Sequence, residues 1–365
     1  MSMPKVSVII SAFNHEKYVA ESINSILSQT FVDFELIVVD NGSTDSTYKI
    51  IKTIKDPRIR VFRIKKNIGF GHALNYALNK SRGEYISLFS SDDICLPDKL
   101  KKQVKYLDDN PGVGAVFTQA QMIDEEGNEI KEYYYDKVFD QKNRNRYEWL
   151  NYFFHNGNCI CFPSALIRKS FYKKIKYENE RLAQLHDFDV WIRLCFEQDI
   201  YIFDDKLVKF RIRSGNMNVG ADTIENKVRS MFEFGHILKH YLEIKNVGEF
   251  FKIFPEAKKR FDDINDNELI PFYVARQALD VKHVFHQKFA LDVLFDLLQN
   301  KKIVSKLNKK SNFDYTDFIR LSGERDIYHV NHIAYQEELV KTLTKQYEDL
   351  KYPLKKLKKI IYAKS

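Results

Sequence analysis

Apolar residues in the first 118 positions follow two alternating patterns. Short continuous apolar runs are typical of strands that are buried on both faces. Such runs span residues 6–12, 34–39, 59–64, 85–89 and 113–118. Between them, apolar residues recur at steps of three and four, as Val19, Ile23 and Ile26 do, which predicts helices. Strands that alternate with helices predict right-handed βαβ units and a mostly parallel sheet.

Polar residues follow these strands at the points where the strands end. They are Asn14, Asp40, Asn67, Gly69, Asp92 and Asp93. Because the carboxyl ends of parallel strands meet at one edge of an open sheet, one ligand could contact all of these positions. Adjacent carboxylates at such an edge suit a hard divalent cation that also binds a phosphate. A turn capped by Asp is the alternative interpretation of this pair.

The pattern changes twice in the rest of the chain. Residues 159–168 resemble a strand, a helix is expected near residues 185–194, and residues 201–203 and 208–212 resemble strands. Arg211 and Arg213 then enter a polar loop, where they either add positive charge to a ligand or pair with Asp204 or Asp205. Beyond about residue 222 only helices are expected, with breaks near Pro255, Pro271 and residues 301–310. We therefore predict a domain of residues 1–221, a helical domain of residues 222–325 and a C-terminal helix of residues 326–365.

The C-terminal helix carries a heptad seam. Its apolar positions are Ile333, Val340, Leu343, Tyr347, Leu350, Leu354, Leu357 and Ile361, and Gln336 fills one gap. Pro353 is expected to kink or restart the helix. Beyond it the polar face carries only lysines, from Lys355 to Lys364. Three interpretations stay open: a helix pair that makes a homodimer, a helix folded back on its own domain, and a basic segment on an anionic membrane surface.

Composition narrows the class of protein. The chain has 365 residues, of which 44% are hydrophobic and 14% aromatic, so it can bury a large core. Its net charge of +8 is modest, and nothing in the sequence indicates a nucleic-acid partner. The four cysteines fit no zinc template and are expected to be reduced, which suggests the cytoplasm. No apolar run approaches the ~20 residues of a spanning helix, so a soluble or peripheral protein is expected.

Four ordered stretches resemble the family 2 glycosyltransferases, and together they cover roughly residues 5–215. They are Val6–Asn14, Glu35–Asp45, Gly83–Pro97 and His186–Arg193. The resemblance implies the GT-A fold, a Rossmann-like and mostly parallel sheet flanked by helices, to which an all-helical C-terminal region is attached here. It also implies an inverting enzyme that moves a sugar from a nucleoside diphosphate sugar, with a UDP-sugar as the favoured donor. The acceptor would be a hydroxyl of a glycan or of a lipid-linked glycan, in the synthesis of a bacterial surface polysaccharide.

The family pattern also assigns roles to individual residues. Asp187 matches the general base, Asp40 contacts the nucleobase, and Asp92 matches the acid that binds Mn²⁺ or Mg²⁺. Around the donor we expect Ala12, Phe13, Asn14, Asp40, Asn67, Gly69, Ser91, Asp92, Asp93 and Arg213. The chain departs from the pattern at Ser90, where the family usually has the first acid of an Asp-x-Asp triplet.

Two alternatives to a glycosyltransferase were weighed. The loss of the acid at Ser90 leaves open a non-catalytic nucleotide-binding or scaffold protein on the same fold. A nucleotidyltransferase would carry a glycine-rich signature with Arg or Lys near the first strand, and residues 11–19 lack it. As a transferase the protein is expected in the cytoplasm, at the inner face of the cell membrane if its lysine-rich tail binds lipid.

Overall fold

The computed structural model describes residues 3–131, 133–214, 223–261 and 264–362. The chain divides into two compact units, Met1–Asn267 and Glu268–Ser365. The boundary predicted at residue 221 lies outside the described residues. The helices that directly follow it belong to the first unit. The three-part division remains a prediction.

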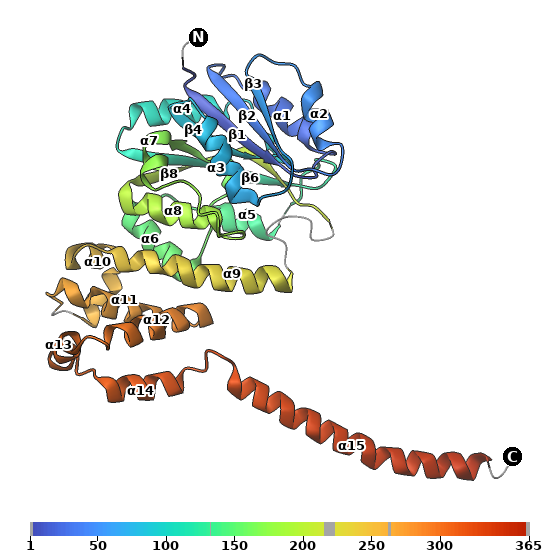
Figure 1. The fold of residues 1–365 in the computed structure, drawn as a ribbon, viewed down its shortest axis with the longest axis vertical. Helices are drawn as coiled ribbons and strands as arrows, with labels where there is room; N and C mark the ends of the chain where they lie inside the picture. The colour runs from blue at the N-terminus through green and yellow to red at the C-terminus, as the bar shows by residue number, and fades with distance from the viewer. Residues whose placement is uncertain (1–2, 132, 215–222, 262–263, 363–365) are drawn as a thin grey trace. The chain divides into compact units, whose positions relative to one another are not determined.

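An eight-stranded sheet forms the centre of the first unit (Figure 1). Its strands are β1 (Val6–Ala12), β2 (Phe34–Asn41), β3 (Ile59–Ile64), β4 (Tyr85–Ser90), β5 (Ile94–Cys95), β6 (Val113–Ile123), β7 (Leu166–Arg168) and β8 (Asp199–Arg211). Their order is β3-β2-β1-β4-β7-β6-β8-β5. The first four strands are parallel, as are β6 and β8, whereas β7 and β5 pair antiparallel with their neighbours. The predicted α/β class is confirmed, and the sheet is mixed.

Helices cover both faces of this sheet. Alternate residues of β1, such as Val8 and Ile10, pack in one cluster with Ile23 of α1 (Val19–Leu27), Ile51 of α2 (Thr47–Thr53) and Leu100 of α4 (Lys99–Asp109). Contacts from α3 (Phe70–Lys80) reach β1 and β2, and contacts from α8 (His186–Glu197) reach β6 and β8. Three further helices complete this part: α5 (Tyr134–Phe139), α6 (Arg146–Asn156) and α7 (Lys169–Lys174). Burial on both sides explains why the strands read as continuous apolar runs.

Several element predictions fail in informative ways. The expected strand of residues 159–168 is a strand only at β7, because a 3₁₀ helix, Phe162–Ser164, precedes it. Pro163 lacks an N–H, and the Ser164 hydroxyl donates to the Cys161 carbonyl, which closes a turn. The two strands expected within residues 201–212 are one long strand, β8.

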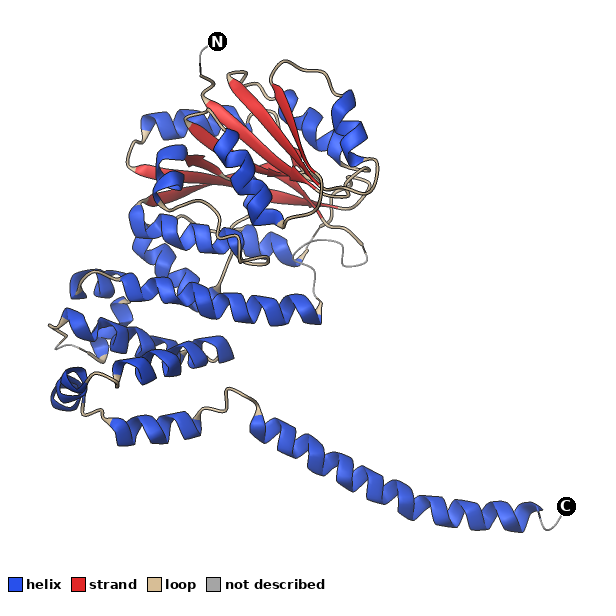
Figure 2. Ribbon diagram, viewed as in Figure 1, coloured by secondary structure: helices blue, strands red, loops and turns tan. Residues whose placement is uncertain are grey.

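The described residues after β8 contain helices and no strand (Figure 2). They form α9 (Ile224–Ile237), α10 (Val247–Ile253), α11 (Ile270–Asp280), α12 (Val284–Leu297), α13 (Lys301–Ser311), α14 (Tyr315–Glu324) and α15 (Val330–Tyr362). Pro271 lies in the first turn of α11, where proline is tolerated. The break expected at residues 301–310 is wrong, since Asn300 caps a helix there. One helix, α15, runs through Pro353, so the expected restart is also wrong. Among the described residues, no helix is long and apolar enough to span a membrane.

Candidate active site

The loops after β1 and β2 are tied together at the carboxyl edge of the sheet. Ala12 lies opposite Asp40 in the parallel register of the two strands. Asn14 has a left-handed backbone, with φ of 53°, and its side-chain oxygen accepts from the Thr44 N–H at 2.8 Å. Asn14 does not cap a helix, since α1 begins at Val19 and Tyr18 is its N-cap. Phe13, beside it, is partly exposed.

Asp40 is fully buried at this edge, yet neither of its carboxylate oxygens accepts a hydrogen bond from the described residues. Its nearest cationic partner is Arg63, whose Nε lies 3.2 Å from Asp40 Oδ2. Buried polar groups are normally satisfied by hydrogen bonds. Asp40 is therefore suited to accept from an N–H of a bound molecule.

The loop after β3 joins the same edge through Asn41. The Asn41 side chain donates to the Asn67 side-chain oxygen and to the Gly69 carbonyl, both at 3.2 Å. Gly69 has φ of 89°, which a residue with a Cβ rarely adopts. Thus Asn67 and Gly69 lie beside the end of β2, as the sequence predicted.

Arg211 at the end of β8 holds the segment after β4 in place. Its backbone N–H donates to Asp93 at 2.8 Å, and its guanidinium donates to the Asp92 carbonyl and to Glu21. Arg211 is buried and pairs with Glu21, so the alternative of a surface arginine paired with Asp204 or Asp205 is wrong. Burial, and next the charge of Asp92, raises the pKa of Asp93 well above its usual range.

Ser91 and Asp92 of this segment form a polar cluster with His15 and Arg213. The Nδ1 atom of His15 lies 2.7 Å from the Ser91 hydroxyl, and Nε2 lies 2.8 Å from the Arg213 guanidinium. The Nε atom of Arg213 lies 3.2 Å from Asp92 Oδ2. Burial lowers the pKa of His15, which favours its neutral ring. The predicted residues Ser91, Asp92 and Arg213 thus meet here with His15, for which the sequence predicts no role.

Asp187 lies in the first turn of α8. Its carboxylate accepts from the Phe188 N–H at 2.7 Å and from the Asn158 side chain at 3.0 Å. Burial raises its pKa above the ordinary value for aspartate. The buried Cys161 thiol connects this residue to the rest of the site, because the nearby carboxylates of Asp93 and Asp187 both raise its pKa further. Asp187 and Asp93 therefore both act on the same buried thiol.

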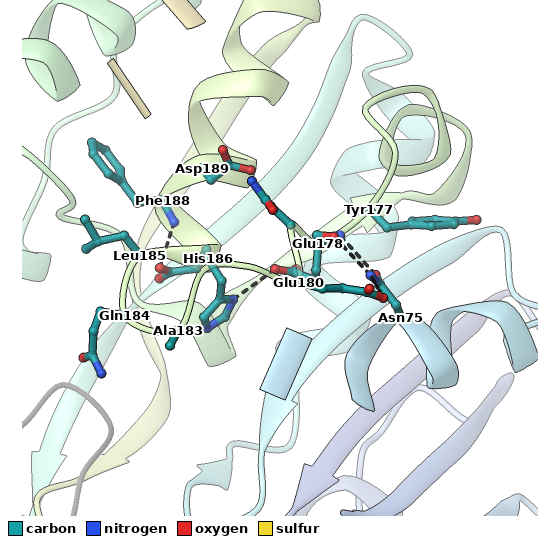
Figure 3. Close-up of polar contacts among 12 residues, drawn as sticks. Asn75, Tyr177, Glu178, Glu180, Ala183, Gln184, Leu185, His186, Phe188 and Asp189 are labelled. Carbon is teal, nitrogen blue, oxygen red and sulfur yellow. Dashed lines mark hydrogen bonds and ion pairs between the residues drawn. The ribbon is translucent and has the colours of Figure 1, made fainter. Parts of the chain in front are cut away.

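Polar contacts fix the start of α8 (Figure 3). The ring of His186 meets Glu178 at 3.0 Å, and Asn75 of α3 accepts from the Glu178 N–H at 3.1 Å. Burial lowers the pKa of His186, but the hydrogen bond and charge of Glu178 more than offset it, so the pKa is raised. Asp189, in the same first turn, binds Arg193 and His240 and so ties α8 to its surroundings.

The buried carboxylate of Glu233, on α9, holds the chain that enters α8. It accepts from the backbone N–H groups of Ala183, Gln184 and Leu185 at 2.8, 2.9 and 2.8 Å. No sequence pattern indicates Glu233, Glu178 or Asn158. His15 could have been identified from the sequence, since it directly follows Asn14, the last residue of the first motif.

The donor atoms present fit a divalent cation. Asp92 offers a hard carboxylate oxygen, and the Nε2 atom of His15 lies 3.9 Å from it. The described residues contain no group of three or more acidic, histidine or cysteine side chains arranged to hold a metal. A cation at this place would take one carboxylate from Asp92, and the oxygens of a diphosphate suit the remainder of its coordination sphere.

Comparisons with known proteins agree with this geometry. The model of glycosyl transferase family 2 matches residues 7–175. An uncharacterized glycosyltransferase of Methanocaldococcus jannaschii is 34% identical over 289 residues, which is 77% of this chain and 95% of that protein. An uncharacterized glycosyltransferase of Haemophilus influenzae is 27% identical over 85% of this chain and 98% of its own length.

Solved structures share the fold at low identity. Residues 1–349 of S. aureus TarS, in complex with UDP-GlcNAc, give a TM-score of 0.56 at 21% identity, covering 83% of this chain and 85% of that one. The mannosyltransferase PcManGT of Pyrobaculum calidifontis, in complex with GDP-Man and Mn²⁺, gives 0.51 at 16% identity, covering 89% and 88%. With the motifs and the site geometry, these similarities lead to one conclusion: the chain belongs to the family 2 glycosyltransferases and has the GT-A fold.

Proposed function

We propose that the protein is an inverting, metal-dependent glycosyltransferase that moves a sugar from a nucleoside diphosphate sugar to a hydroxyl of a glycan or lipid-linked glycan. A UDP-sugar is the favoured donor. The observation that carries this proposal is Asp187 itself, a buried carboxylate in the first turn of α8 that acts with the carboxylate of Asp93 on the Cys161 thiol. A proton acceptor and a cation-binding acid at the same edge of a sheet suit transfer to a hydroxyl.

Each side chain has a distinct task in this proposal. Asp40 accepts from the nucleobase, since its oxygens lack donors among the described residues. The donor also rests on Ala12, Phe13, Asn14, Asn67, Gly69, Ser91 and Asp93. Asp92 holds a divalent cation, Mn²⁺ or Mg²⁺, and Arg213 lies within reach of the same charge.

Asp187 is the base of the transfer. It takes the proton of the acceptor hydroxyl while that oxygen attacks the anomeric carbon. A bound divalent cation neutralises the charge on the departing diphosphate. Attack from the face opposite the diphosphate inverts the anomeric centre. The raised pKa of Asp187 matches the task, because a more basic carboxylate accepts a proton more readily.

The setting we propose is the synthesis of a bacterial surface polysaccharide. The enzyme would act in the cytoplasm at the inner face of the membrane. We propose contact with membrane lipid through the lysines of residues 355–364. The side chains of these residues lie outside the described part of the structure. A homodimer through α15 is the second proposed contact, and its argument is given in the Discussion.

Donor hydrolysis tests the proposed activity. The protein is incubated with UDP-, GDP-, CDP- and dTDP-sugars and Mn²⁺ or Mg²⁺, and release of the nucleoside diphosphate is followed. We expect release from one donor. We expect Asp187→Asn to lower acceptor-dependent turnover at least about 100-fold while donor affinity stays nearly unchanged. No release, and no rise in melting temperature with any nucleotide, would favour a non-catalytic scaffold.

A further inference from the structure

We propose that Nε2 of His15 is a second protein ligand of the divalent cation, beside Asp92, and that this imidazole makes the site prefer Mn²⁺ over Mg²⁺. The inference rests on the proposed function, because it assumes that a metal binds with a nucleoside diphosphate. It assigns a role to a residue that the sequence motifs leave without one.

The hydrogen bonds of His15 determine which ring nitrogen carries no proton and therefore has the lone pair that a metal ion binds. A guanidinium can only donate, so the Nε2 atom 2.8 Å from Arg213 must accept and carries no proton. The proton of the neutral ring is therefore on Nδ1, which donates to the Ser91 hydroxyl at 2.7 Å. Ser91 in turn donates to the Ser11 carbonyl at 3.3 Å. Histidines that bind metals are oriented in the same manner, through a hydrogen bond from the other nitrogen.

The separation of the two atoms suits a shared cation. Nε2 of His15 and Oδ2 of Asp92 lie 3.9 Å apart. Two ligands about 2.1 Å from one metal are about 3.0 Å apart when adjacent in an octahedron and about 4.2 Å apart when opposite. The observed distance falls between these limits, so a small side-chain rotation brings both atoms into coordination.

Positive charge already lies against both atoms. The Arg213 guanidinium contacts His15 and Asp92 together, and its side chain is only 9% exposed. A cation that binds the two ligands takes the place of this guanidinium. The released Arg213 is then available to the diphosphate, which is the role the sequence assigned to it.

The imidazole also accounts for the missing acid at Ser90. The Ser90 hydroxyl hydrogen-bonds Asp93, so it faces the buried carboxylate. Asp93 is held by the backbone of Arg211. The first and third positions of the usual triplet therefore provide one carboxylate, Asp92, and His15 supplies the second donor atom from the neighbouring loop.

Ligand chemistry predicts the selectivity. Imidazole nitrogen binds first-row transition metals well, whereas Mg²⁺ strongly prefers oxygen. A site with one carboxylate and one imidazole should therefore favour Mn²⁺, and Co²⁺ still more, in the usual order of affinity.

The test measures metal binding directly, with the full chain. Mn²⁺ is titrated into the protein with saturating UDP and, in parallel, GDP, and free Mn²⁺ is followed by its EPR signal. Mg²⁺ affinity comes from competition. The variants are His15→Asn, whose amide can replace only Nδ1, and His15→Gln, whose amide oxygen reaches the place of Nε2. His72→Asn is the control, since His72 is half-exposed and pairs with Glu180.

We expect His15→Asn to weaken Mn²⁺ binding at least about tenfold, because even second-shell losses at metal sites cost 10- to 100-fold. His15→Gln should lower the ratio of Mn²⁺ to Mg²⁺ affinity while keeping most Mg²⁺ binding. His72→Asn should match the wild type. Equal Mn²⁺ affinity in His15→Asn and wild type would overturn the inference, as would absence of metal binding in the wild type. If UDP and GDP bind equally well with and without metal, this inference fails together with the metal dependence of the proposed function, while nucleotide binding by the fold stands. If no nucleotide binds, the proposed function fails as well.

Discussion

Asp187 is a carboxylate whose proton affinity is set by two opposing effects. Burial raises its pKa, while the charge of His186 and hydrogen bonds from Phe188 and Asn158 lower it. We predict that Asn158→Ala raises the pKa further, because the carboxylate loses a donor. A hydrogen bond to a charged group contributes about 1.5–3 kcal/mol, which corresponds to roughly one to two pH units. The acid limb of the kcat/KM profile should move to higher pH by about that amount.

Asn156→Ala is the matched control for this measurement. Asn156 lies two positions earlier, at the end of α6, and its side chain donates to the Tyr152 carbonyl. The acid limb of the kcat/KM profile of Asn156→Ala should coincide with that of the wild type. An unchanged limb in Asn158→Ala would show that Asp187 is not the group that titrates in turnover.

At the same scale, the sequence predicts those site residues that belong to local motifs. Asp40 is the next-to-last residue of the buried strand β2 and Asp92 lies two residues past β4, so the pattern of apolar runs alone places them at the sheet edge. Asn158 and Glu233 reach the site from distant segments, and nothing next to them in sequence distinguishes them from ordinary polar residues. The role of Arg211 was missed because a buried arginine that clamps backbone carbonyls resembles any basic residue at a strand end.

Helix α9 holds the chain that enters α8 through Glu233, a contact between two elements of the first unit that would position Asp187 as the proposed base. Its carboxylate accepts three backbone N–H groups just before α8. We predict that Glu233→Gln lowers the free energy of unfolding by about 2–3 kcal/mol, since an amide offers one acceptor oxygen and turns a donor toward a donor. Turnover should fall about tenfold or more as Asp187 shifts, while UDP affinity stays unchanged. Denaturant unfolding, kcat and nucleotide binding measure the three effects.

The control on the same helix is Glu225→Gln, because Glu225 is exposed in the first turn of α9. It should leave stability within about 0.5 kcal/mol of the wild type and turnover unchanged. If Glu233→Gln loses stability but keeps full turnover, Glu233 holds the fold together without positioning the base.

The success of element prediction depends on how each element is buried. The strands β1 and β3 match their predicted bounds, since parallel strands covered on both faces leave an uninterrupted apolar run. The segment before β7 was misassigned because its apolar residues are buried in a turn rather than in a ladder. The predicted break at residues 301–310 is wrong because this lysine-rich segment still carries an apolar face. Ile303 and Leu307 form the buried face of α13.

At the scale of the whole molecule, α15 presents an apolar seam to solvent. The side chains of Ile333, Val340, Leu343, Tyr347 and Leu350 are all exposed. In heptad register, Ile333, Val340 and Tyr347 occupy one core position and Leu343 and Leu350 the other. β-Branched residues at the first position with leucine at the second favour a parallel two-stranded coiled coil. A second copy of the chain is therefore the partner that fits this seam.

Light scattering during size-exclusion chromatography tests the pairing. We predict a dimer at micromolar concentration, which Leu343→Asp converts to a monomer, because a charge in the seam must lose its hydration on pairing. Thr342→Asp is the control, since residue 342 lies outside the core positions of the heptad, and it should remain dimeric. Donor hydrolysis should be equal in all three proteins, because every site residue assigned here lies within Met1–Asn267. A wild-type monomer would exclude the coiled coil, and binding of that monomer to anionic vesicles would instead support the membrane interpretation of the C-terminal helix.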